Sequence, residues 1–278
     1  MMEWFGPLVQ GPAKHVLRIA RDPDYRAFCS LDAKLRGVPR HQECRARVDG
    51  WDLTIPDAAS FLSSYREIFV ERTLDFPQDR DAPRILDLGA NIGLSVLAFK
   101  RQHPRARITA LEPDPGLFQV LTRNVHGNGF TDVTLLQRAA WREDARLPFA
   151  PDGADGGRAV VDRSPGAEPG ARWIDVEAIS LPDLLRREAF DTIKMDIEGA
   201  ERAVLPACAG LLGGVSRMFV EYHGAAHEAS ALGAVLAPLE DAGFHIQVQT
   251  VRSPRHPFLE DGASLGLDLI LHIYAMRV

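Results

Sequence analysis

Two glycines and one acidic residue, Asp87, share a short stretch, residues 87–93, that has the composition of a nucleotide-binding turn. The stretch follows the apolar residues of a predicted buried strand and precedes a predicted helix. Glycines at positions 89 and 93 allow the backbone to approach a ligand closely, and the start of the helix offers free N–H groups to an anionic group. Glu112 ends the next predicted strand, where a carboxylate can accept hydrogen bonds from two ribose hydroxyls. These residues predict a nucleotide or nucleoside site.

Two positions in this stretch indicate which nucleotide is bound. A dinucleotide-binding turn has a second glycine where this chain has Asn91, and Asp87 would face a diphosphate unfavourably. An acid there suits a cationic ligand, and S-adenosylmethionine carries an ammonium and a sulfonium group. We expect its ribose at Glu112, its carboxylate at the helix start, and its adenine beside the small residues after the third strand. The residues expected to contact this cofactor are Asp87, Gly89, Ala90, Asn91, Gly93, Ser95, Glu112, Pro113, Ala139, Ala140 and Asp196.

A second charged stretch, residues 191–201, lies at the end of another predicted strand. Alternation places Lys194 and Asp196 on one face of that strand. Asp196 lies at the carboxyl end, beside the first strand, where ligands bind in open α/β sheets. Glu198 is expected to begin the next helix, and Glu201 either caps that helix or has a functional role.

The strand predicted over residues 217–223 adds a candidate base. Glu221 and His223 share one of its faces, and a histidine at the carboxyl end can take up a proton at neutral pH. A histidine that binds substrate without titrating is equally compatible with the sequence. A third interpretation gathers four side chains around Mg²⁺, which prefers oxygen ligands, but their spacing matches no dedicated metal motif. The catalytic candidates are Asp196, Glu198 and His223; the substrate candidates are Tyr65, Glu67, Lys194, Glu221 and His223; the alternative magnesium ligands are Asp196, Glu198, Glu221 and His223.

Alternating strand and helix patterns from residue 84 onward predict the elements that position these side chains. Such alternation produces right-handed crossovers and a mostly parallel sheet with helices on both faces. The last two strands are separated by a loop with proline and glycine rather than by a helix, so they should form an antiparallel pair. The predicted strands are 84–87, 107–111, 133–137, 192–196, 217–223, 244–251 and 267–276, and the predicted helices are 93–102, 115–126, 181–187, 200–212 and 229–242.

The chain divides into an N-terminal cap, residues 1–80, and a main domain, residues 81–278. In the cap we expect a helix over 22–35, a β-hairpin that turns at Asp49 and Gly50, and a helix over 58–73. A small β-insertion interrupts the main domain at about residues 145–179, with short strands at 158–161 and 173–179. Its segment 148–172 is rich in glycine and proline, which predicts a mobile loop.

The amino-acid composition limits the classes of protein to which this chain can belong. The 278 residues are 46% hydrophobic and 25% charged, which is ordinary for a globular protein and rules out wholesale disorder. The net charge of −6 argues against a nucleic-acid partner, because such proteins usually carry a basic balance or patch. The three cysteines form no CxxC motif and suit reduced thiols in the cytoplasm, and we predict neither a signal peptide nor a membrane span.

The two charged stretches together resemble the hallmark sequences of FkbM-type methyltransferases. The similarity lies in residues 87–93 and 193–201, and residues 57–69 are similar to the run that precedes the first hallmark. The resemblance covers roughly residues 47–278 and implies a class I S-adenosylmethionine-dependent methyltransferase that usually acts on a hydroxyl oxygen. It also implies a Rossmann-like sheet in the order 3-2-1-4-5-7-6 with strand 7 antiparallel, and a natural-product or sugar intermediate as the small-molecule acceptor.

Other functions compete with O-methylation of a small molecule. A nicotinamide-dependent oxidoreductase is opposed by Asn91 in place of the second glycine. A non-catalytic module that only binds S-adenosylmethionine would not need the acids and His223 at the sheet edge. A nucleic-acid N-methyltransferase is expected to carry a (D/N)PP(Y/F/W) motif, which this sequence lacks.

Overall fold

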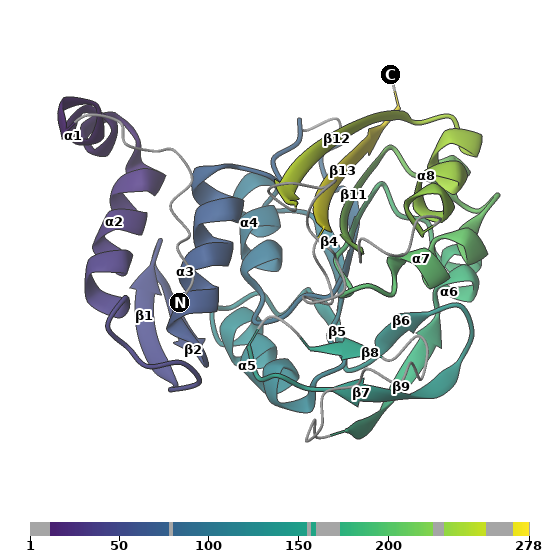
Figure 1. The fold of residues 1–278 in the computed structure, drawn as a ribbon, viewed down its shortest axis with the longest axis horizontal. Helices are drawn as coiled ribbons and strands as arrows, with labels where there is room; N and C mark the ends of the chain where they lie inside the picture. The colour runs from purple at the N-terminus through teal and green to yellow at the C-terminus, as the bar shows by residue number, and fades with distance from the viewer. Residues whose placement is uncertain are drawn as a thin grey trace, which may run out of the picture.

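The computed structural model describes residues 12–77, 80–154, 157–159, 173–224, 231–253 and 269–277. Within these ranges a central sheet lies between helices, with the N-terminal elements on one side and a smaller sheet below it in Figure 1. Most of the predicted mobile loop, the end of the strand predicted at 158–161 and the connection between the last two strands lie outside the described residues. No helix in the described ranges is long and apolar enough to cross a membrane.

The central sheet has seven strands in the spatial order β12-β13-β11-β10-β3-β4-β5. All strands run parallel except β13, which is antiparallel to both of its neighbours. Numbered along the chain, this order is 3-2-1-4-5-7-6, so the predicted Rossmann-like fold is confirmed. The strands are β3 (Arg84–Leu88), β4 (Arg107–Leu111), β5 (Thr134–Leu136), β10 (Thr192–Met195), β11 (Arg217–Gly224), β12 (His245–Arg252) and β13 (Leu269–Met276).

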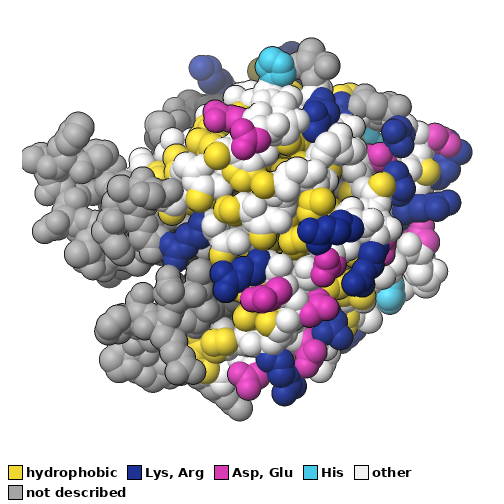
Figure 2. Space-filling view, turned by 90° about the vertical axis from the view of Figure 1, so that its right-hand side faces the viewer, with side chains coloured by type: hydrophobic (Ala, Val, Ile, Leu, Met, Phe, Trp, Pro, Cys, Tyr) yellow, Lys and Arg dark blue, Asp and Glu magenta, His cyan; other side chains and the backbone are white. Residues whose placement is uncertain are grey.

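The central strands of this sheet, β3 and β10, are buried on both faces, whereas the edge strand β12 is largely exposed. In β3, Ile85 packs into the hydrophobic cluster beside α4 and α5, whereas Leu86 packs into the cluster beside α6, α7 and α8. Figure 2 looks onto this second side of the molecule, where Lys and Arg side chains lie among Asp and Glu side chains. The helices are α4 (Leu94–Gln102), α5 (Pro115–His126), α6 (Leu181–Arg187), α7 (Glu201–Val204) and α8 (Ala231–Asp241).

The prediction of one continuous helix over residues 200–212 is wrong. Helix α7 ends at Val204, and two short 3₁₀ turns, Pro206–Cys208 and Leu212–Gly214, follow it. The proline at the start of the first turn has no N–H with which to continue the helical hydrogen bonds. Gly210 then adopts a left-handed backbone with φ of +76°, which a continuing helix does not allow.

The N-terminal cap contains two helices, the predicted hairpin and a further helix that ends in a π-helical turn. Asp49 and Gly50 both have positive φ at the tip of the hairpin, as a two-residue Asp-Gly turn requires. The helix predicted over 58–73 widens in its second half, where the N–H of Glu71 donates to the carbonyl of Arg66. The elements are α1 (Pro12–Arg21), α2 (Pro23–Leu35), β1 (Cys44–Val48), β2 (Trp51–Ile55), α3 (Ala58–Tyr65) and the π-helical turn (Arg66–Val70).

The cap and the main domain share a hydrophobic core. Phe61 of α3 packs in the same cluster as Leu121 of α5. Asn124 of α5, 1% exposed, accepts a hydrogen bond from the N–H of Thr54 at 2.8 Å and donates to the carbonyl oxygen of that residue at 3.0 Å. Its amide also donates to the carbonyl of Ile92 at 2.9 Å. Asn124 therefore fixes the cap hairpin against the glycine-containing turn after β3.

A four-stranded sheet in the order β6-β9-β7-β8 combines three strands from the region of the predicted β-insertion with β6, which precedes that region. The side-chain amide of Asn91 donates to the carbonyl of Ala154 at 3.0 Å, which connects the insertion to the turn after β3. The small sheet thus lies beside the residues expected to bind the cofactor. Its strands are β6 (Ala139–Trp141), β7 (Ala145–Ala150), β8 (Arg158–Ala159) and β9 (Ile174–Ser180).

Candidate active site

The carboxyl ends of β3 and β10 approach so closely that the residue between them must be glycine. Gly89 has φ of +80°, and a Cβ atom there would lie 1.8 Å from the carbonyl oxygen of Asp196. The N–H of Asp196 in turn donates to the carbonyl of Leu88 at 3.0 Å. This contact joins the glycine-containing turn after β3 to the charged turn after β10.

A buried lysine holds these two turns together. The Nζ atom of Lys194 donates to the carbonyl oxygen of Gly89 at 2.7 Å. It lies 3.4 Å from Asp87 Oδ1 and 3.3 Å from Asp196 Oδ2. Burial lowers the pKa of Lys194, but the charges of Asp196 and Asp87 outweigh this effect and hold the pKa above its usual value. Because its side chain is only 6% exposed, Lys194 stabilises the two turns rather than making the substrate contact considered from the sequence.

Four residues expected to contact the cofactor do not line the cleft that the structure forms. Asp87 is 0% exposed, and the hydroxyl of Ser95 donates to its Oδ2 at 2.5 Å. The charge of Asp87 is therefore balanced by Lys194 and is not presented to a cationic ligand. Ala90 is 2% exposed. Gly93 is required for packing, because a Cβ there would lie within 3.0 Å of side chains of α5.

The cleft has an empty volume of about 620 Å³, opens to solvent, and runs between the turns after β3 and β10. The apolar side chains of Leu117, Phe149 and Ile197 also line it. None of these three was expected in the site from the sequence, although Phe149 is a buried position that alternates with partly exposed ones in a strand of the insertion. The predicted residues that line the cleft are Gly89, Asn91, Glu112, Pro113, Ala139, Ala140, Asp196 and Glu198.

Two backbone hydrogen bonds orient Glu112 at one end of the cleft. Its Oε1 accepts from the N–H of Asp114 and its Oε2 from the N–H of Asn91, both at 2.9 Å. Each carboxylate oxygen keeps a lone pair for another donor. Burial raises the pKa of Glu112 to about 7, although the two hydrogen bonds act in the opposite direction. The carboxylate of Glu112 is therefore held in a fixed orientation in which both oxygens can accept further hydrogen bonds.

At the other end of the cleft, acids surround His223, which is 6% exposed. Its Nε2 lies 3.5 Å from Glu198 Oε2 and 3.6 Å from Glu221 Oε1. Its Nδ1 lies 3.8 Å from Glu201 Oε1. Burial lowers the pKa of His223, but Glu201 and Glu198 raise it to about 10. The neighbouring carboxylates thus favour the protonated imidazole, the form that is less suited to remove a proton.

Glu198 lies in a turn before the helix and not at the helix start predicted for it. Its backbone has φ of +55°, an uncommon conformation for a residue with a side chain. Helix α7 begins at Glu201, whose carboxylate accepts from the N–H groups of Ile197 at 2.9 Å and Gly199 at 3.2 Å. Burial raises the pKa of Glu198 well above its usual value, although His223 lowers it. With 23% of its side chain exposed, Glu198 presents a carboxyl group to the cleft.

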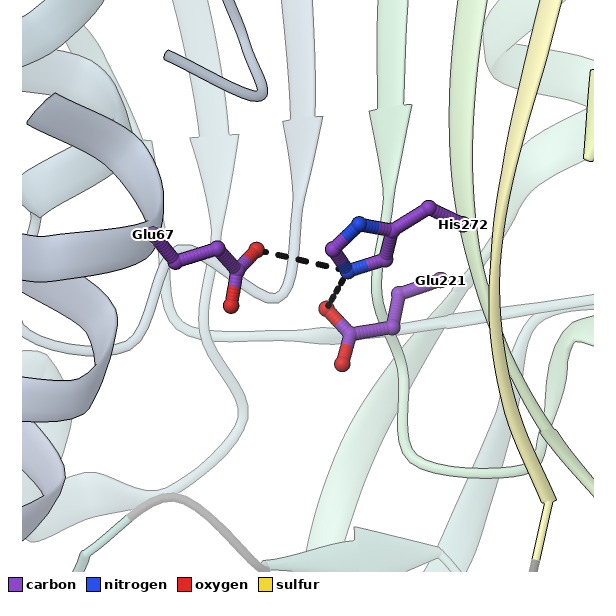
Figure 3. Close-up of side chains that lie close together, drawn as sticks. All are labelled: Glu67, Glu221 and His272. Atoms are coloured by element: carbon purple, nitrogen blue, oxygen red, sulfur yellow. Dashed lines mark ion pairs between the residues drawn. The ribbon is translucent and has the colours of Figure 1, made fainter. Parts of the chain in front are cut away.

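Figure 3 shows a second group of ionisable side chains, Glu67, Glu221 and His272. The Nε2 atom of His272 lies 3.4 Å from Glu67 Oε1 and 3.6 Å from Glu221 Oε2. Burial, and then the charge of Glu221, raise the pKa of Glu67 to about 7. The sequence analysis missed His272, because only the antiparallel register of β11 and β13 places it directly opposite Glu221.

A polar groove with an empty volume of about 1250 Å³ leads from this second group to the surface. Glu67 and His272 line it, together with side chains of the π-helical turn region and of β12 and β13. Tyr65, the other candidate substrate contact in the cap, is 0% exposed and stacks on Phe69 with ring centroids 4.7 Å apart. Tyr65 is therefore a core residue and not part of the groove.

The fold and the cleft define the class of protein. A parallel sheet in the order 3-2-1-4-5-7-6 with one antiparallel strand, and a cleft at the carboxyl ends of its central strands, form the architecture of a class I methyltransferase. Residues 87–246, more than half of the chain, match the family model described as the methyltransferase FkbM domain. The chain belongs to the FkbM methyltransferase family.

Two curated relatives and one solved structure show the range of similarity. Methyltransferase sdnD of Sordaria araneosa is 34% identical over 171 residues, which are 51% of this chain and 66% of sdnD, slightly less than two thirds of that protein. The 31-O-demethyl-FK506 methyltransferase FkbM of Streptomyces tacrolimicus is 30% identical over 224 residues, covering 68% of this chain and 82% of the relative. The crystal structure of methyltransferase FkbM from Methylobacillus flagellatus KT is 18% identical, covers 94% of this chain and 60% of that chain, and has a TM-score of 0.46.

Removing the charge of Lys194 should destabilise the protein. The Lys194→Met variant leaves Asp87 buried without its cation, which should cost about 3–5 kcal/mol of unfolding free energy. The double variant Lys194→Met/Asp87→Asn removes both charges and should recover part of this loss. Urea unfolding followed by circular dichroism measures both effects. Equal stability of the parent and Lys194→Met chains would contradict the role assigned to Lys194.

Proposed function

We propose that the chain is an S-adenosylmethionine-dependent O-methyltransferase that methylates a hydroxyl group of a small molecule, such as a natural-product or sugar intermediate. The observation that carries this proposal is that one cleft is lined by the oriented carboxylate of Glu112 and by the acids Asp196 and Glu198, and that Glu198 lies next to His223. Membership in the FkbM family supports methyl transfer. The name of the relative that acts on 31-O-demethyl-FK506 supports an oxygen acceptor.

The residues of the cleft fit S-adenosylmethionine. Glu112 would hold the ribose hydroxyls, because its two oxygens are oriented acceptors with free lone pairs. Ala139 and Ala140 leave room for the adenine base, and Leu117 and Phe149 provide apolar surface beside it. The acidic end of the cleft suits a sulfonium cation. When bound, this cofactor supplies an activated methyl group for transfer to the acceptor oxygen.

The polar groove is the proposed entrance for the acceptor. Ser63, Gln247 and Gln249 line it and offer hydroxyl and amide groups that can hydrogen-bond to a hydroxylated molecule. Glu221 lies between the groove and the cleft, because its carboxylate is 3.6 Å from both His272 and His223. An acceptor that reaches Glu221 from the groove is thus close to the acidic end of the cofactor cleft.

We propose that Glu198 accepts the proton of the acceptor hydroxyl. Its carboxyl group lines the cleft, and His223 Nε2 lies 3.5 Å away. A cationic imidazole at this distance orients the carboxylate and stabilises its charge. Asp196, whose carboxylate Lys194 fixes in the lining of the cleft, would lie beside the cofactor. In this arrangement His223 positions the base and the acceptor and does not itself remove the proton.

The affinity of the cleft for adenosine compounds should depend on the ionisation of Glu112. Its pKa is raised to about 7, so its ionised fraction, and with it the ability to accept two ribose hydrogen bonds, falls as the pH drops through that value. We expect binding of 5′-methylthioadenosine, which carries the ribose but no amino-acid group, to weaken about tenfold from about pH 8 to about pH 6. Titration calorimetry measures this change.

Two variants serve as controls for that titration. Glu112→Gln should bind more weakly at pH 8 and show no pH dependence in this range, because its amide does not titrate. Glu188→Gln, an exposed substitution after α6, should behave like the parent chain. Tight binding of NADH with no binding of adenosine thioethers would overturn the proposed cofactor.

Substitution of Glu198 should slow methyl transfer without weakening cofactor binding. We expect Glu198→Gln to lower kcat by about 10²–10⁴-fold, because the acceptor hydroxyl loses its proton acceptor. The measurement is transfer of labelled methyl from S-adenosylmethionine to the best acceptor in a panel of hydroxylated natural products and sugars, with Glu188→Gln as the control. A raised KM with unchanged kcat would make Glu198 a substrate contact and reject its role as base.

A further inference from the structure

We propose that Glu67, Glu221 and His272 bind one divalent transition-metal ion, such as Zn²⁺ or Mn²⁺, at the inner end of the polar groove. One oxygen from each carboxylate and a ring nitrogen all lie within 4.8 Å of one another. One imidazole and two carboxylates form a mixed nitrogen and oxygen donor set, which such ions accept. The three ligands differ from the magnesium set considered from the sequence, with which they share only Glu221.

The distances in this group suit shared coordination better than direct hydrogen bonding. His272 Nε2 lies 3.4 Å from Glu67 Oε1 and 3.6 Å from Glu221 Oε2. Two ligands of a tetrahedral ion, each about 2.0–2.1 Å from the metal, lie about 3.3–3.4 Å apart. His272 is 4% exposed, and its Nε2 has no hydrogen-bond partner although it points between the two carboxylates (Figure 3). A buried ring nitrogen without a hydrogen-bond partner needs a further partner.

The surrounding charges also favour a cation. Glu221 is shared with the neighbouring acidic group around His223, and Lys194 is already engaged by Asp87 and by the carbonyl of Gly89. Even with both histidines protonated, carboxylates outnumber cationic side chains in the two groups together. The carboxylates are Glu67, Asp87, Asp196, Glu198, Glu201 and Glu221, and the cationic groups are Lys194, His223 and His272.

The backbone holds the three ligands on separate elements. Glu221 and His272 are directly opposed in the ladder between β11 and β13, and the ring of Phe219 lies 5.0 Å from that of His272. Glu67 comes from the π-helical turn of the cap, a type of irregularity that is common at functional sites. The ion would thus fasten the cap to the sheet. If the ion also polarises the hydroxyl group of an acceptor in the groove, that role rests on the proposed function. The binding of the ion to these three residues does not depend on the proposed function.

Titration of chelator-treated full-length protein with Zn²⁺ and Mn²⁺ in a calorimeter, without nucleoside or acceptor, tests the site. We expect one site per chain in the parent protein and affinity lower by about 100-fold or more in Glu67→Gln and in His272→Gln. Glu71→Gln is the matched control, because it changes a carboxylate that lines the same groove but lies outside the group, and it should bind like the parent. Circular dichroism shows whether each variant is folded.

Absorption of Co²⁺ bound to the parent chain adds a second measurement that needs no variant, since a coordinating imidazole and carboxylates give a tetrahedral visible spectrum. A parent chain that binds none of these ions, or a Glu67→Gln chain that binds them as the parent does, would overturn the proposal. Binding of S-adenosylhomocysteine to the same metal-free protein is measured separately. Metal binding without nucleoside binding would reject only the proposed function, and the reverse result would reject only the metal site.

Discussion

The buried ammonium group of Lys194 is the interaction on which the site depends. It neutralises Asp87 inside the sheet, holds Asp196 at the rim, and donates a hydrogen bond to the carbonyl oxygen of Gly89. An unpaired carboxylate in this interior would be very costly, so the ion pair is fixed in place. Because these residues come from adjacent strands, the same contact that stabilises the sheet also sets the two turns that form the cofactor cleft.

The N-terminal cap is part of this architecture and not an independent module. Its hairpin is tied through Asn124 to the turn after β3, and its π-helical turn brings Glu67 to the acids of the sheet. Glu221 connects the two groups, since it faces His223 on the cofactor side and His272 on the groove side. Glu221 therefore links His272, which lines the groove, to His223, which lies beside Glu198 of the cleft, and the proposed reaction needs a methyl donor and an acceptor close to this carboxylate.

Residue type and spacing predicted the local parts of this picture, and tertiary pairing decided the rest. The positions of glycine and acidic residues in the turn after β3 predicted the cleft, because such a turn is formed by residues that are neighbours in the sequence. Most of the residues that line the cleft were predicted from patterns of this local kind. Asp87 forms an ion pair with Lys194. This pairing depends on the register of β3 with β10, which no local pattern reveals. His272 escaped notice for the same reason. In contrast, the end of the helix at Val204 could have been predicted from the proline that follows it.

The central claim is that the cleft binds the methyl donor with its reactive end toward the acids around His223. A crystal structure of the chain with S-adenosylhomocysteine tests this most directly. We expect the ribose hydroxyls to hydrogen-bond to Glu112 and the sulfur to face Asp196 and Glu198. Nucleoside bound elsewhere, or bound in the cleft with the sulfur directed away from these acids, would contradict it.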